Sequence, residues 1–193
     1  MSTRTPLLQS TGQFFHAYNR GVNREKIFFR EQDYRLFLQI VSECTDGVDI
    51  VILAYCLMPN HFHFVLRQDE PYAMAHFFRH LCDTYVKRIN ALYGRVGHLF
   101  QGAYKPKLVD NLDTLPNLSR YIHRNPVAAN LVSDPILWEY SSSREYCGLR
   151  PSTFINKSII LDHVGGTERY RDYLSDPMDT LDEDLMRCLV EEG

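Results

Sequence analysis

The sequence predicts a mixed α/β domain of the α+β class, in which an antiparallel sheet has helices packed on one face. Strand and helix patterns follow one another in the order β-α-β-β-α-β-α, and one pair of strands is joined by a tight turn. Hydrophobic residues make up 45% of the 193 residues, which is enough for a substantial core. After about Arg150 the composition becomes acidic. We therefore expect a domain over residues 1–150 and an acidic, partly helical C-terminal extension over residues 151–193.

The first three elements are predicted from local patterns. Phe14 to Asn19 has the composition of a short strand, and Asn19-Arg20-Gly21 is a turn signal. Apolar side chains then recur at helical spacing from Asp33 to Cys44. Asp49 to Met58 is rich in β-branched and aromatic residues, which predicts a buried strand.

A hairpin and a long helix follow. Pro59-Asn60 predicts a turn, and His61 to Arg67 alternates as the second strand of the hairpin. A helix is expected from about Ala73 to Tyr93, where Gly94 follows, and another strand from Gly102 to Val109.

The last helix of the domain is expected over Leu115 to Arg124, with Thr114 as its cap. Pro126 is expected to end it, because the residue before a proline is pushed out of helical geometry. Weaker helical patterns occur in the extension at Thr167–Leu174 and Thr180–Val190.

The most distinctive short motif is His61-Phe62-His63. Residues two apart in a strand point to the same side of the sheet, so His61 and His63 present two imidazoles together while Phe62 faces the core. Two adjacent imidazoles are a good start for a divalent metal site. The motif is also compatible with two histidines that are merely half-exposed on a sheet face.

A second candidate site lies on the helix before Pro126. Tyr121 and Asn125 are four residues apart, so both can point toward the same place. The Asn125 carbonyl can serve as a third ligand for a hard cation such as Mg or Mn, with Tyr121 beside it as a nucleophile. The alternative is a tyrosine at the edge of an apolar stripe and an asparagine at a helix end.

Charge is unevenly distributed along the chain. The totals of 21 basic and 24 acidic residues give −3, which taken alone argues against a polyanion-binding protein. Residues 151–193, however, hold four of the basic and ten of the acidic residues, which leaves 17 basic and 14 acidic residues in the first 150. From His76 to Lys107 six basic residues accompany a single acid, and aromatic residues are interleaved with them. This pattern suits single-stranded nucleic acid, although a solvated helix face over core aromatics would produce it too. We expect the acidic extension to compete with phosphates for the basic face.

The five cysteines are scattered and include no C-x-x-C pair, which favours a reducing compartment. Residues 1–15 lack the apolar core of a signal peptide, and the longest apolar run is too short to span a membrane. We therefore expect a soluble cytoplasmic protein without a membrane partner.

Three ordered motifs resemble the single-tyrosine HUH transposases, and most of all their REP-associated tyrosine transposase branch. They are Tyr55-Cys56-Leu57-Met58-Pro59-Asn60-His61-Phe62-His63, Gly97-His98-Leu99-Phe100-Gln101-Gly102 and Arg120-Tyr121-Ile122-His123-Arg124-Asn125-Pro126-Val127. Tyr18-Asn19-Arg20-Gly21-Val22 and Trp138-Glu139-Tyr140-Ser141-Ser142 also match. The similarity covers roughly Gly12 to Gly148.

The resemblance implies a ferredoxin-like or RRM-like fold and a metal-dependent endonuclease and strand transferase that acts on single-stranded, hairpin DNA. It implies Tyr121 as the nucleophile that forms a 5′-phosphotyrosine, and His61, His63 and Asn125 as ligands of Mg or Mn. It also implies a bacterial protein associated with the nucleoid, and it leaves open whether the protein is a monomer or a homodimer.

DNA-binding residues are expected in the basic stretch and the second motif. They are Arg79, Lys87, Arg88, Arg95, His98, Gln101, Lys105 and Lys107. Ala103 departs from the family pattern, which has a basic residue after Gln-Gly.

Two other functions remain open. One is a catalytically silent RRM-like module that only binds single-stranded DNA or RNA. The other is a different HUH nuclease, such as a replication or plasmid-transfer initiator, although the Asn-Pro-Val helix and the short chain argue against it. The sequence supplies no unambiguous general base for the tyrosine.

Overall fold

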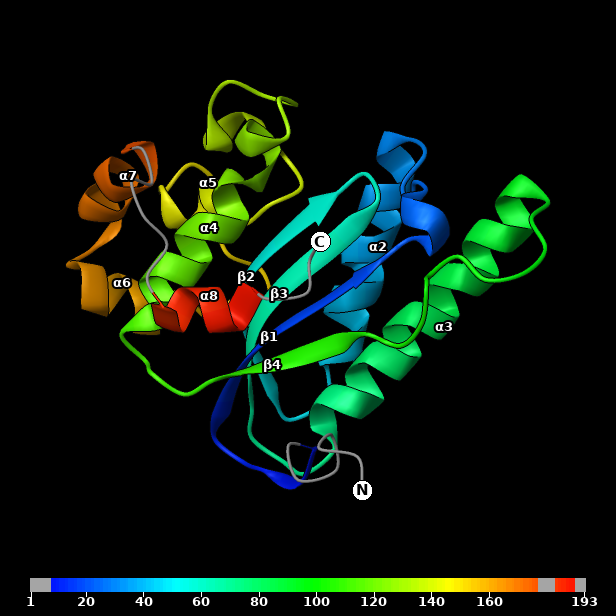
Figure 1. Ribbon diagram of the computed structural model, residues 1–193, viewed down its shortest axis with the longest axis horizontal. Coiled ribbons are helices and arrows are strands. Elements are labelled where there is room, and N and C mark those ends of the chain that lie inside the picture. Colours follow the sequence, from blue (N-terminus) through cyan, green and yellow to red (C-terminus); the bar gives the residue numbers. More distant parts are fainter. Residues whose placement is uncertain (1–7, 177–182, 190–193) are drawn as a thin grey trace.

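The protein is built on a four-stranded antiparallel sheet (Figure 1), seen here in a computed structural model that describes residues 8–176 and 183–189. The strands are β1 (Gln13–Arg20), β2 (Ile50–Met58), β3 (His61–Gln68) and β4 (Lys105–Val109). Their order in the sheet is β2-β3-β1-β4, so the first and third strands of the chain occupy the centre. With one helix between β1 and β2 and another between β3 and β4, this is the ferredoxin-like arrangement.

Two long helices cover one face of the sheet. They are α2 (Glu31–Thr45) and α3 (Ala73–Tyr93), and they pack on each other as well as on the strands. Phe62 and Phe64 alternate along β3 and point into this layer, where Phe62 meets Phe37 of α2 and Phe78 of α3. All four rings are almost completely buried. The predicted fold class is therefore confirmed, with α2 and α3 as the helices that share one face.

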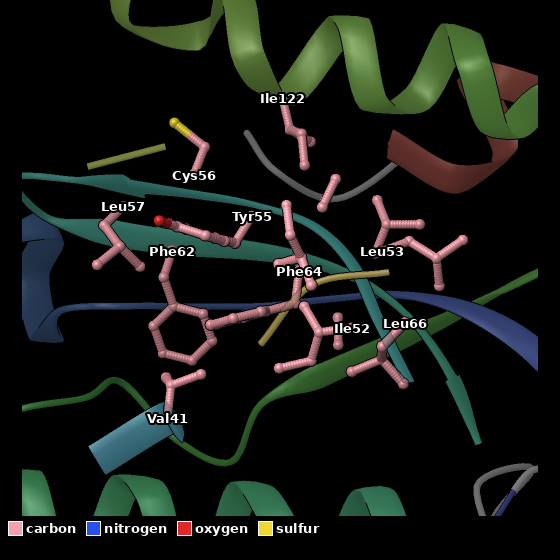
Figure 2. Packing of buried hydrophobic residues seen from close by; sticks show 14 of the residues in the cluster. Val41, Ile52, Leu53, Tyr55, Cys56, Leu57, Phe62, Phe64, Leu66 and Ile122 are labelled. Carbon is pink, nitrogen blue, oxygen red and sulfur yellow. The ribbon is translucent and has the colours of Figure 1, made fainter. Parts of the chain in front are cut away.

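A third helix, α4 (Thr114–Ala128), packs against the opposite face along β2. Figure 2 shows Ile122 of α4 and Cys56 of β2 on one side of the sheet, with Phe62 of β3 and Val41 of α2 on the other. Because Cys56 is directly opposite His63 in the strand register, the face that α4 partly covers is the face that carries the histidines.

Pro126 does not end α4, contrary to the expectation from the sequence. The helix runs through Pro126 to Ala128, so Asn125 keeps helical geometry. The backbone N–H groups of residues 129, 130 and 131 donate to the carbonyls of Asn125, Val127 and Pro126, so this last turn is closed by its own hydrogen bonds. Proline costs one backbone donor near a helix end, and Pro126 is buried, which offsets that cost.

The expected strand from residue 102 begins only at Lys105. Before it, the segment 97–104 is attached to the end of β1: Gln101 N–H donates to the Arg20 carbonyl, and the Asn19 side chain donates to the Gly102 carbonyl. These bonds satisfy polar groups that a sheet ladder would otherwise use. They also hold Gln101 beside Arg20 at the end of β1.

The C-terminal half adds short helices around α4. They are α5 (Ser143–Tyr146), α6 (Ser158–Val164), α7 (Thr167–Ser175) and α8 (Glu183–Leu189), together with the short 3₁₀ helix η2 (Pro135–Leu137). Another 3₁₀ helix, η1 (Val22–Arg24), follows β1. Tyr170 of α7 is fully buried, with its ring centroid 4.5 Å from that of Tyr146. The helical pattern at Thr167–Leu174 is thus confirmed, whereas residues 180–182 and 190 of the second pattern lie outside the described residues. The boundary at Arg150 remains a prediction.

Within the described ranges, none of the helices is both long enough and apolar enough to cross a membrane.

Candidate active site

A pocket of about 450 Å³ opens on the histidine-bearing face of the sheet. Its lining comes from β1, β3, the start of β4 and three other segments, which are η1, the β2–β3 turn and the segment before β4. The lining residues are Tyr18, Asn19, Arg20, Arg24, Asn60, His61, His63, Gln101, Gly102, Ala103 and Lys105. The strand register explains the grouping, because Tyr18 lies opposite both His63 and Lys105, and Arg20 lies opposite His61. Cross-strand partners share a face, so one row of side chains converges on this pocket.

His61 and His63 lie side by side, as the H-x-H spacing predicts, with ring centroids 4.9 Å apart. Each ring also has a hydrogen-bond partner at Nδ1. His61 Nδ1 is 2.7 Å from Asn60 Oδ1, and His63 Nδ1 is 3.0 Å from Nε2 of His16 on β1. His16 is fully buried and lies on the same face of the sheet as His63, outside the pocket lining.

Burial keeps both pocket imidazoles neutral at pH 7. It lowers the pKa of His61 to about 4, with the nearby Arg20 charge as the second cause. Burial also lowers the pKa of His63 well below its ordinary value, and His61 and His16 add to the effect. A neutral imidazole is the form that binds a metal ion, so the donor chemistry fits a divalent cation.

Three cations surround the histidines. Arg20, Arg24 and Lys105 line the pocket, and Arg20 Nε donates to Gln101 Oε1 at 2.5 Å. Lys105 and Gln101 are among the residues that the sequence predicts to bind DNA. Arg20 and Arg24 were missed, because they lie far from the basic stretch in sequence, although Arg20 stands in the Tyr18–Val22 motif.

A second cavity of about 800 Å³ runs between α3 and the segment 97–104. Three predicted DNA-binding residues, Arg79, Lys87 and His98, line it together with the buried rings of Phe78 and Tyr104. Both cavities share Asn19, Gly102 and Ala103 in their linings. The histidine pocket and this second cavity, called the α3 groove below, are therefore neighbours that share one stretch of wall.

The other expected DNA-binding residues lie outside the linings of these two cavities. Arg88 is exposed on α3. Arg95 stacks over Phe29, with the guanidinium carbon 5.4 Å from the ring centroid. Lys107 is half-buried on β4, opposite His16.

Tyr121 and Asn125 lie on α4, one turn apart and both half-buried. Among the described residues, the lining of the histidine pocket includes none from α4. Two arginines flank Tyr121 in sequence and fasten α4 to the end of α7: Arg120 donates to the Asp176 carbonyl, and Arg124 donates to the Leu174 carbonyl at 2.7 Å. The structure thus brings His61 and His63 together and places Tyr121 and Asn125 on a neighbouring helix.

A buried polar network around His123 also anchors α4. His123 Nδ1 is 2.9 Å from Tyr170 Oη, and His123 Nε2 is 2.7 Å from Ser142 Oγ. Ser142 Oγ in turn accepts the backbone N–H of Tyr55 on β2. The network connects α7, α4 and the sheet.

Comparison with known proteins gives a consistent assignment. The family model described as IS200-like transposase matches residues 11–125, which is more than half of the chain. The chain also resembles the solved structure of a REP-associated tyrosine transposase bound to a REP hairpin, with a TM-score of 0.60 and 18% identity over 74% of this chain and 85% of that one. No curated protein matches. The matched segment contains β1, the hairpin with His61 and His63, and α4 as far as Asn125, and the chain belongs to the family of IS200-like transposases.

Proposed function

We propose that this protein is a metal-dependent single-stranded DNA endonuclease and strand transferase that acts on hairpin DNA. The observation that carries the proposal is the pairing of two neutral imidazoles with three cations in one pocket of a transposase-family chain. The similar fold of a transposase solved with a REP hairpin supports hairpin DNA as the substrate.

His61 and His63 would hold the cation, here Mg or Mn. Among the described residues, no group of three or more His, Cys, Asp or Glu side chains could hold a metal ion. We propose the Asn125 amide oxygen, water and a DNA phosphate oxygen as the remaining ligands. When bound, the cation supplies Lewis-acid polarisation of the scissile phosphate.

The protein side chains perform the rest of the reaction. Arg20, Arg24 and Lys105 hold the phosphate and neutralise its charge. Tyr121 Oη attacks phosphorus, so that a Tyr121 Oη–P bond forms and the P–O3′ bond breaks. The phenolic proton passes to solvent and the released O3′ takes up a proton from solvent, which leaves a 5′-phosphotyrosine and a 3′-hydroxyl. The phosphodiester energy stays in the protein link, so rejoining needs no ATP.

The α3 groove provides a path for the strand next to the cleaved phosphate. Arg79, Lys87 and His98 can follow its backbone, and Ala103 lines both this groove and the histidine pocket. Cations beside aromatic surfaces suit single-stranded DNA. Arg88, Arg95 and Lys107 remain proposed contacts outside the two linings.

The test is formation of a covalent adduct. The full-length protein, Mn²⁺ and a labelled hairpin oligonucleotide should yield a protein–DNA species that survives denaturing electrophoresis. Tyr121→Phe should abolish it. Tyr18→Phe is the matched control, because Tyr18 lines the histidine pocket and Tyr121 does not. If the adduct persists in Tyr121→Phe and disappears in Tyr18→Phe, the nucleophile is Tyr18 on β1 and not Tyr121.

One observation favours a second candidate, a module that binds single strands without cleaving them. Within the described part of the chain, residues of α4 are absent from the histidine pocket lining, so Tyr121 is not already positioned there. Metal-independent hairpin binding by the native chain, with no adduct under any metal, would support this candidate over the enzyme.

A further inference from the structure

Metal ligation by an imidazole requires the lone pair on one ring nitrogen and the proton on the other. In this pocket both ligand histidines have their Nδ1 atoms engaged by neighbouring side chains, Asn60 for His61 and His16 for His63. Which nitrogen of each ring carries the proton, and which keeps its lone pair for a cation, is therefore decided by residues outside the H-x-H motif.

The tautomer of His61 follows from the hydrogen bonds of Asn60. The Asn60 Nδ2 group donates to the Arg24 carbonyl at 3.1 Å, and a carbonyl can only accept. Asn60 Oδ1 is then the atom that faces His61, at 2.7 Å from Nδ1, and it can only accept as well. His61 must carry its proton on Nδ1, which places its lone pair on Nε2.

The second pair is buried more deeply. His16 is 0% exposed and His63 is 2% exposed, and their facing nitrogens are 3.0 Å apart. One of these two nitrogens must donate and the other accept. The ring of His16 is also stacked against Tyr18, with centroids 5.2 Å apart, which fixes its plane.

We propose that His16 and Asn60 are positioning residues that set the tautomers of the metal-binding pair. His63 Nδ1–H donates to His16 Nε2 just as His61 Nδ1–H donates to Asn60 Oδ1, so both histidines present Nε2 to one cation. This inference rests on the proposed metal-dependent function. The inference extends the proposed function by assigning a role to two side chains, His16 and Asn60, that need not touch the metal. Outer-layer partners of this kind change metal affinity by roughly 10- to 100-fold when they are removed.

The first test needs no metal. Long-range ¹H–¹⁵N NMR of the full-length protein reports which nitrogen of each ring carries the proton. We expect the Nδ1–H tautomer in both His61 and His63. His16→Leu should convert His63 toward the Nε2–H form and leave His61 unchanged, while Asn60→Leu should do the reverse. An Nε2–H tautomer at either ring of the native protein would overturn the proposal for that ring and its partner.

The second test measures Mn²⁺ binding by electron paramagnetic resonance. His16→Leu should weaken binding by roughly 10- to 100-fold, and His16→Gln should restore most of it, because the Gln amide oxygen can replace His16 Nε2 as the acceptor. This rescue separates positioning from a general packing defect and keeps the test usable if His16→Leu fails to fold.

The two proposals fail in distinguishable ways. If the native chain binds Mn²⁺ and His61→Ala abolishes binding, but His16→Leu and Asn60→Leu bind as tightly as the native chain, the positioning role alone is wrong. If the native chain binds no Mn²⁺, or His61→Ala leaves binding intact, the metal site of the proposed function is wrong.

Discussion

Acidification should destabilise this protein through His123, the histidine of the network beneath α4. Burial lowers the pKa of His123 to about 3, whereas the unfolded chain has an ordinary value near 6.5. Below about pH 6.5 the unfolded chain takes up a proton that the native His123 does not accept, so the free energy of unfolding falls as the pH falls toward about 3. Above about pH 6.5 the group makes no pH-dependent contribution.

The magnitude follows from the size of that shift. Each pH unit between the two pKa values costs about 1.4 kcal/mol, so lowering the pH from about 6.5 to about 4 removes roughly 3 kcal/mol. This is a large part of the stability of an ordinary domain. His61 and His63 add acid sensitivity of the same sign, so the native protein alone cannot isolate the contribution of His123.

The matched variant is His123→Gln, whose amide can bond to Tyr170 and Ser142 but does not titrate. Urea unfolding followed by circular dichroism, at several values from about pH 7.5 to about pH 4, gives the free energy of unfolding of both proteins. The native protein should lose roughly 3 kcal/mol more than the variant over this range. A difference that stays constant with pH would refute the reasoning, whatever its size, because His123 would then have no depressed pKa.

Three further predictions concern the proposed DNA contacts, the proposed metal site and the acidic extension. Ala103→Arg adds a cation at a position that lines both cavities. It should tighten the binding of single-stranded DNA and steepen the dependence of log K on log salt by about 0.7. Fluorescence anisotropy at several salt concentrations measures the affinity and the slope, and an unchanged slope would contradict a phosphate contact at this position. Mn²⁺ should support adduct formation at lower concentration than Mg²⁺, because imidazole nitrogen favours transition metals, and equal half-saturating concentrations of the two ions would argue against an imidazole site. The triple variant Asp162→Asn, Glu168→Gln and Asp172→Asn neutralises three exposed acids of the extension. It should bind nonspecific DNA more tightly at low salt. Unchanged or weaker binding would disprove the competition between these acids and the DNA phosphates.

Elements with strong local signals could be predicted from the sequence. The expected bounds of α3, Ala73 to Tyr93, are those of the structure, because an apolar stripe and a terminal glycine define them locally. The alternation of His61, Phe62 and His63 likewise separates pocket from core correctly.

Features that depend on long-range packing could not be predicted from the sequence. Pro126 was expected to stop α4, and only the burial of its ring and the bonds of the following turn explain why the helix continues. His16 and Arg20 join the site through the register of β1 with β3, which no local pattern reveals. The role of Asn60 needs the position of the Arg24 carbonyl. For Tyr121, the helical spacing places it correctly on α4, and its role as nucleophile remains a prediction.

The attachment of α7 to α4 bears on how this chain can be shortened. Residue 150 is the obvious place to cut, because the removed part is acidic and lies beyond the matched segment. That cut would take Tyr170 out of the space between Tyr146 and His123 and leave Arg120 and Arg124 without the carbonyls they hold. Filling a buried space of tyrosine size is worth several kcal/mol, on the order of 3 to 5. The charge of the extension is therefore better altered by substitution. A cut at residue 150 would also remove α7, which packs against α4, the helix that carries the proposed nucleophile.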